Sequence, residues 1–150
     1  MWEINGLPLH PLVVHAAVVL GPLAVLAALA YVGWPKHRDL LRWVALVSVL
    51  LATAAIWAAY LTGNNFYSHG NFDQFSQQIK DRIATHQGYA RTLRWITTGF
   101  AVVTVLATWM HSRMGAARIV LNALVVVGAV LTLVWLALTG DAGARAVWGK

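Results

Sequence analysis

An all-helical membrane bundle is the fold class that this sequence predicts, and three observations predict it. Apolar residues make up 59% of the chain and charged residues only 11%, against about a quarter charged in soluble domains. Four stretches approach or exceed the roughly 20 apolar residues that cross a bilayer: Leu9–Trp34, Leu41–Leu61, Leu93–Met110 and Ala117–Leu138. Val44–Ala59 carries only Ser48 and Thr53 as polar residues, whereas a helix of a soluble bundle keeps a polar face.

The first span is expected to begin at a proline and to carry a seam of small side chains. Proline suits the first helical position, where its missing N–H costs nothing, so we expect His10 at the N-cap and a helix from Pro11. Small residues at helical spacing let membrane helices approach closely; here they are Ala17, Gly21, Ala24 and Ala28. The helix is expected to end at Gly33-Trp34-Pro35.

The later spans follow two short turns and one long connection. The second span runs to Thr62-Gly63 and leads into a polar, turn-rich stretch, Asn64–Gly70. Apolar residues then recur every three or four positions from Phe72, which predicts an amphipathic helix that continues into the third span. We therefore expect a single membrane domain over 1–150, with spans at about 10–34, 41–62, 90–111 and 117–139 and an extracytoplasmic connection over 63–89.

Charge predicts the orientation of these spans. An even number of spans places both termini on one side of the membrane, and the two short turns share the other. The short turns concentrate basic residues, namely Lys36, Arg38, Arg42, Arg113 and Arg118. Basic residues in short loops favour the cytoplasm, so both termini are expected to be extracytoplasmic. The net charge of +6 is then explained by helix ends and anionic lipid, and no nucleic-acid partner is expected.

The sequence lacks the residues and motifs that several kinds of chemistry require. The chain has no cysteine, which excludes disulfides, thiolate metal sites and cysteine nucleophiles. It also lacks a phosphate-binding glycine loop, a His-Glu-x-x-His motif and a serine nucleophile elbow. No enzyme class is favoured, and whether the protein is an enzyme stays open.

Histidines gathered at one end are the only indication of chemistry. Counting about 1.5 Å per residue from the cytoplasmic ends of the helices places His10, His86 and Asp141 at a common level just outside the hydrocarbon, with His15 about 7 Å deeper. Imidazole is a common metal ligand. His10, His15, His86 and Asp141 are therefore candidate ligands of a transition metal such as zinc, iron or copper. Alternatively, His10, His15 and His86 are candidate ligands of haem b, which facing imidazoles hold in other bundles.

Other interpretations of the same residues stay open. His10 can simply cap a helix, and His15 and His86 can form interhelical hydrogen bonds. The leading hypothesis is a haem- or metal-binding module for electron transfer or redox chemistry, with other membrane or redox proteins as partners. The alternatives are a non-catalytic accessory or scaffold subunit, with a homo-oligomer possible, and a channel or carrier for a small solute.

The N-terminal segment also resembles a known family. The stretch Gly6–His15, with its His-Pro-x-x-x-His pattern, is similar to the start of the bacterial membrane family catalogued as domain of unknown function 2231. Thr62-Gly63, His86 and the glycine-rich Gly140–Trp148 extend the resemblance over nearly the whole chain. The resemblance implies a four-helix domain in the bacterial cytoplasmic (inner) membrane and an extracytoplasmic histidine site. The family often has histidine where this chain has Asp141, and a carboxylate there suits a metal better than a haem.

Overall fold

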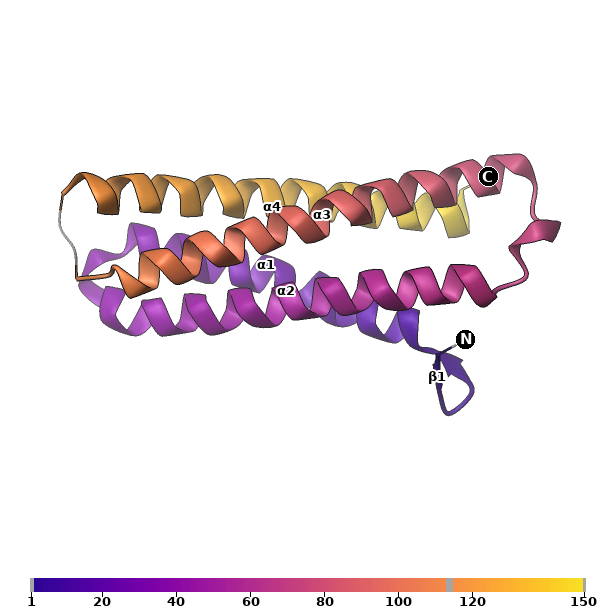
Figure 1. Ribbon diagram of the computed structural model, residues 1–150, viewed down its shortest axis with the longest axis horizontal. Coiled ribbons are helices and arrows are strands. Elements are labelled where there is room, and N and C mark those ends of the chain that lie inside the picture. Colours follow the sequence, from indigo (N-terminus) through magenta and orange to yellow (C-terminus); the bar gives the residue numbers. More distant parts are fainter. Residues whose placement is uncertain (1, 113–114, 150) are drawn as a thin grey trace.

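Four long helices lie side by side and alternate in direction along the molecule (Figure 1). The computed structural model describes residues 2–112 and 115–149. The long helices are α1 (Leu9–Gly33), α2 (Arg38–His69), α3 (Gln77–Trp109) and α4 (Ala116–Trp148). Two 3₁₀ helices, η1 (Pro35–His37) and η2 (Phe72–Gln74), lie in connections between them. The predicted helical bundle is confirmed.

The four helices form two hairpins. α1 packs mainly on α2 and α3 mainly on α4, while α2–α3 and α1–α4 contacts join the two pairs. The hairpins lie close together at the end that carries the short connections, and they separate toward the end that carries both termini (Figure 1). We call these the connection end and the terminal end.

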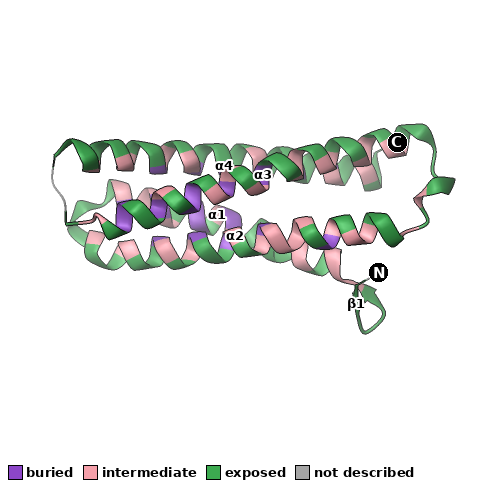
Figure 2. Ribbon diagram, viewed as in Figure 1, coloured by how far each residue is buried: buried purple, intermediate pink, exposed green. Residues whose placement is uncertain are grey.

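Buried residues lie on the inward sides of the helices (Figure 2), and many of them are small, whereas many large apolar residues are exposed. The most deeply buried side chains, at 1% exposure or less, include Ala24, Ala28, Ala45, Ala52 and Ala129. Large apolar side chains such as Leu26 and Ile119 are 63% and 69% exposed. This distribution suits helices that pack closely through small residues while lipid covers the outside. The predicted seam of α1 is confirmed, because all four of its residues are buried.

Three of the helices are long and apolar enough to cross a membrane: α1, the segment Pro35–His69 and α4. Among the described residues, α3 does not have this combination of length and apolar composition. It carries Arg94, whose guanidinium lies 4.0 Å from the centre of the Tyr60 ring, and buried threonines whose hydroxyls donate to carbonyls of their own helix, such as Thr97 to Leu93. α3 runs beside the other helices (Figure 1), and its crossing of the membrane stays a prediction.

The N-terminus differs from expectation. α1 begins at Leu9 with Pro8 as its N-cap, so the prediction of His10 as N-cap is wrong. A small antiparallel hairpin, β1 (Glu3–Ile4) and β2 (Leu7–Pro8), precedes it. Asn5 and Gly6 connect the strands with φ angles of 52° and 77°. An Asn-Gly pair with two positive φ angles is the preferred two-residue turn of a β-hairpin.

Two segments predicted as irregular are helical. α2 continues through Asn64 to His69, and α4 continues through the glycine-rich tail to Trp148. Tertiary contacts stabilise both extensions: the Trp2 backbone N–H donates to the Asn65 side chain at 2.8 Å, and Arg82 donates to the Gly149 carbonyl at 2.6 Å. Residues 70–76 separate α2 from α3, and α3 runs without a break from Gln77 to Trp109, as expected for a helix that leads into the third span. The extracytoplasmic connection over 63–89 between the second and third spans stays a prediction.

Candidate functional site: a histidine pair on two equivalent hairpins

The two hairpins repeat each other in structure. Each buried residue of α1 has a buried counterpart 76 positions further on, in α3. The pairs are Ala17/Leu93, Gly21/Thr97, Ala24/Phe100, Val25/Ala101, Ala28/Thr104 and Tyr31/Ala107. The match extends over the six buried positions of α1, so α1 and α3 occupy equivalent places in the bundle.

α2 and α4 correspond in the same way. Here the offset is 80 positions, and it relates Ala45 to Val125, Val49 to Ala129, Ala52 to Thr132 and Thr62 to Ala142, all of them buried. The connection from α3 to α4 (110–115) is two residues longer than the one from α1 to α2 (34–37), and α4 begins two residues before the counterpart of the first residue of α2; together these account for the larger offset. The molecule thus has an approximate two-fold arrangement, with each hairpin as one unit.

Histidine stands out under this equivalence. The offset of 76, fixed by burial alone, pairs His10 with His86. Along the whole of α1 and its counterpart in α3, this is the one pair of identical residues. Two equivalent histidines therefore lie at the terminal end, one on each hairpin.

Both histidines make the same hydrogen bond. Nδ1 of His10 lies 3.0 Å from the carbonyl oxygen of Ala59 in α2, and Nδ1 of His86 lies 2.9 Å from the carbonyl oxygen of Thr139 in α4. Ala59 and Thr139 are themselves 80 positions apart and so equivalent. Each hairpin therefore orients its imidazole against the backbone of its second helix.

A glycine one turn further along gives each imidazole its space. A Cβ on Gly63 would lie 2.9 Å from Cε1 of His10, and a Cβ on Gly143 would lie 3.1 Å from Cε1 of His86. The first distance is shorter than carbon–carbon contact allows, and the second is tight. Each ring can lie this close to the neighbouring helix because Gly63 and Gly143 have no side chain.

The hydrogen bonds decide which nitrogen is available for a ligand. A carbonyl oxygen can only accept, so Nδ1 carries the hydrogen in both rings and the neutral imidazole has its lone pair on Nε2. Within the described residues, no hydrogen bond reaches Nε2 of His10 or His86. Both rings thus combine a fixed Nδ1–H with a free Nε2, the arrangement usual for metal-ligating histidines.

The surroundings of the pair are largely apolar. Both rings are half-buried. The His10 ring stacks on Phe66 at 6.2 Å between centroids. Deeper in the bundle lies a cluster formed by Ala17, Ile56 and Leu93. A positive charge on His86 would act electrostatically on the His10 ring.

The other predicted ligands are not gathered with this pair. His15 is exposed on α1, and its Nδ1 bonds the Pro11 carbonyl at 2.6 Å. Asp141 is exposed on α4 and forms an ion pair with Arg145 at 2.8 Å. In the part of the chain that the structure describes, no group of three or more His, Cys, Asp or Glu residues has the spacing to hold a metal ion.

The glycines beside the histidines carry no clear signal in the sequence. Gly63 follows the second apolar run as an ordinary helix end would, and Gly143 is one of several glycines in the C-terminal segment. The repeated Leu-Thr-Gly at 61–63 and 138–140 is a misleading signal, because it pairs Gly63 with Gly140, whereas the structure pairs Gly63 with Gly143. The equivalence of Gly63 and Gly143 follows from the burial pattern, which the structure provides and the sequence alone does not.

The fold and its apolar exterior define the class, a helical membrane protein. Residues 6–150 match the family described as "Predicted membrane protein (DUF2231)", and the chain belongs to this family. No curated protein and no solved structure matches the chain.

Proposed function

We propose that His10 and His86 bind a haem b between the two hairpins, and that the protein transfers electrons at the extracytoplasmic face of the membrane. The single observation that carries this proposal is the equivalence of the two imidazoles. Each has its Nδ1–H on a carbonyl oxygen of the neighbouring helix, at 3.0 Å and 2.9 Å, and each has Nε2 available.

The number of ligands favours haem over a lone metal ion. A mononuclear zinc or non-haem iron site takes at least three protein ligands, and the described residues offer no such group. Haem supplies four nitrogens of its own and takes two axial imidazoles from a helical bundle. A pair of histidines is therefore a sufficient protein contribution.

The chain's own residues perform the binding and the tuning. The carbonyls of Ala59 and Thr139 fix the tautomer and the orientation of the two rings, as hydrogen-bonded partners of ligands do elsewhere. Phe66 and the cluster of Ala17, Ile56 and Leu93 keep water from the inner side. A bound haem would supply one-electron chemistry, with a potential set by its ligands and by burial.

Buried residues are more frequent toward the connection end (Figure 2), and neither histidine belongs to the larger core cluster, which has Tyr31 and Ala107 among its members. A cofactor held by His10 and His86 would therefore not replace that cluster.

The test is an absorption spectrum combined with elemental analysis of the protein purified from its host membrane. We expect an intense haem absorption and about one iron per chain. His10→Ala and His86→Ala should each reduce the haem content at least about tenfold, since each removes an axial ligand.

His15→Ala and Asp141→Asn serve as matched controls and should retain haem, because neither side chain lies with the pair. Protein without haem but with a stoichiometric transition metal would replace this proposal by a metal site. Protein with neither would contradict both.

A further inference from the structure

We propose that a pocket at the connection end, opposite the histidines, binds a phosphate group, either from an anionic phospholipid headgroup or from a free phosphate anion. The pocket has a volume of about 400 Å³ and lies where α2 and α4 begin and α3 ends. Its lining residues are Pro35, Arg38, Asp39, His111, Arg118, Ile119 and Asn122.

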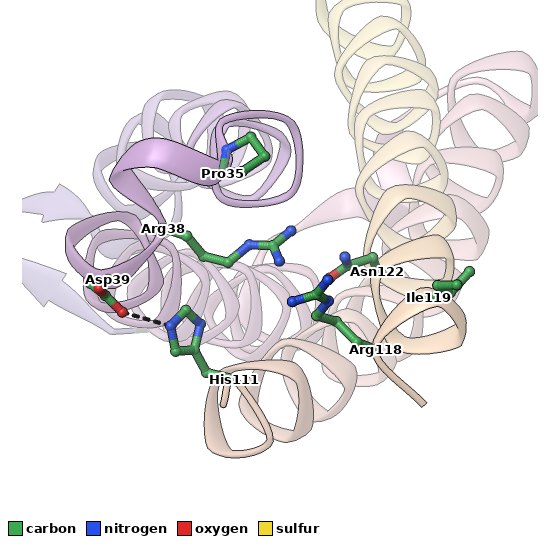
Figure 3. Close-up of a pocket in the computed structure, with 7 residues that line it drawn as sticks. All are labelled: Pro35, Arg38, Asp39, His111, Arg118, Ile119 and Asn122. Carbon is green, nitrogen blue, oxygen red and sulfur yellow. Dashed lines mark hydrogen bonds and ion pairs between the residues drawn. The ribbon is translucent and has the colours of Figure 1, made fainter. Parts of the chain in front are cut away.

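Two arginines point into this pocket from opposite sides (Figure 3). Arg38 stands on α2 and Arg118 on α4, and the side-chain amide of Asn122 lies beside the Arg118 guanidinium (Figure 3). Arg38 is positioned by two hydrogen bonds to the end of α1, from Nε to the Tyr31 carbonyl at 3.3 Å and from Nη2 to the Val32 carbonyl at 3.2 Å. Guanidinium has five N–H donors, so three donors of Arg38 stay available.

The two arginines are equivalent under the two-fold arrangement. Arg38 and Arg118 are 80 positions apart, as are Arg42 and Asn122. Each hairpin therefore contributes an arginine from the first turn of its second helix, followed one turn later by Arg42 or Asn122. The first turns of α2 and α4 also point their positive dipole ends toward this region, which favours an anion.

The charge balance of the pocket is positive. The guanidinium groups of Arg38 and Arg118 line the pocket together with one carboxylate. The carboxylate that lines the pocket, Asp39, is 91% exposed and bonds Nε2 of His111 at 2.7 Å. The lining as a whole therefore carries two guanidinium groups and one carboxylate.

Phosphate is the anion that this arrangement fits. Guanidinium groups bind phosphate oxygens in pairs through parallel N–H donors, and the Asn122 amide adds a neutral donor. The exposed indoles of Trp34 and Trp109 mark the same end of the bundle, and tryptophan concentrates at the headgroup level of a bilayer. A lipid phosphate would thus lie at the right depth.

The experiment is native mass spectrometry of the full chain in a mild detergent, titrated with phosphatidylglycerol, with phosphatidylcholine and with inorganic phosphate. We expect phosphatidylglycerol to bind saturably and more tightly than phosphatidylcholine, or inorganic phosphate to bind saturably and displace phosphatidylglycerol. The first result identifies a lipid headgroup as the ligand and the second identifies a free phosphate.

Arg118→Gln should weaken the binding at least about tenfold, as the loss of a charge-assisted hydrogen bond does. Lys36→Gln removes a charge near the same end but outside the pocket lining, and it should leave the binding unchanged. Asn122→Ala keeps every charge and should weaken the binding less than Arg118→Gln does. It provides a second test if Arg118→Gln does not fold. Equal weakening by Lys36→Gln, or unchanged binding in both pocket variants, would overturn the proposal.

Discussion

The contact between an imidazole and a glycine is the residue-scale feature on which the site depends. His10 lies against Gly63 and His86 against Gly143. Each ring also hydrogen-bonds a backbone carbonyl that lies one turn before the glycine, in the helix of that glycine. The arrangement fixes both the position and the tautomer of the ring without any charged partner. The absence of a charged partner favours stability, because a charged side chain buried in a membrane protein is costly.

Gly63→Ala should displace the His10 ring, because the new Cβ would lie 2.9 Å from Cε1. We expect haem content to fall several-fold while the protein still folds. Gly140→Ala is the matched control, since a Cβ there meets no atom within 4 Å. It should retain haem and stabilise the helix by about 0.5–1 kcal/mol. If Gly63→Ala retained as much haem as Gly140→Ala, Gly63 would not be needed to position the His10 ring.

Tyr31→Phe tests the polar contact at the other end of the core. The hydroxyl is buried and donates to the Ala107 carbonyl of α3 at 3.0 Å, so its loss should lower the free energy of unfolding by about 1 kcal/mol. The measurement is reversible unfolding in mixed micelles of increasing denaturing detergent. Tyr67→Phe, at an exposed tyrosine, should have no effect; equal stability of the two variants would contradict this assignment.

At the scale of the element, the helices are held by small residues in contact. Ala28 has no exposed surface, and Ala45 on α2 is equally buried. Ala28→Leu should therefore overpack the interface and cost at least about 1–3 kcal/mol, measured by the same unfolding transition. Ala54→Leu makes the identical change on the lipid-facing side of α2 and should cost little. Similar losses from both changes would contradict the seam as the main helix–helix contact.

The sequence predicted the helices better than their ends. Apolar runs identify α1, α2 and α4 because the bilayer demands about 20 such residues. The ends depend on tertiary contacts that no local pattern contains. Asn64–His69 is polar yet helical, since α2 continues beyond the apolar span and Asn65 accepts a hydrogen bond from Trp2. The Asn5-Gly6 hairpin was visible in principle, as a known turn signal.

At the scale of the whole molecule, the two-fold arrangement explains what could be predicted of the site. Counting residues from the connection end predicts that His10 and His86 lie at one level, and the electrostatic action of His86 on His10 agrees with that. The same count put Asp141 at that level but could not give its direction around the helix, where it faces Arg145. The equivalence itself was hidden, because the hairpins share burial pattern but hardly any identical residues.

Membrane topology provides a prediction for the molecule as a whole. The chain has no cysteine, so single cysteines report sidedness without background. If all four helices cross, Ser68→Cys should react with a membrane-impermeant maleimide in intact cells, whereas Lys36→Cys and Ala116→Cys should react only after permeabilisation. Labelling of Ala116→Cys in intact cells would mean that α3 does not cross the membrane.

The spin state of bound haem is the measurement that tests the central claim most directly, namely that the two hairpins bring His10 and His86 to one cofactor. Electron paramagnetic resonance of the oxidised protein should give a low-spin signal, as two axial imidazoles produce. His86→Ala should convert any remaining haem to high spin, while His69→Ala, at a histidine bonded within α2, should leave it low spin. A protein that binds no haem, or one whose low-spin signal survives in both His10→Ala and His86→Ala, would contradict the account.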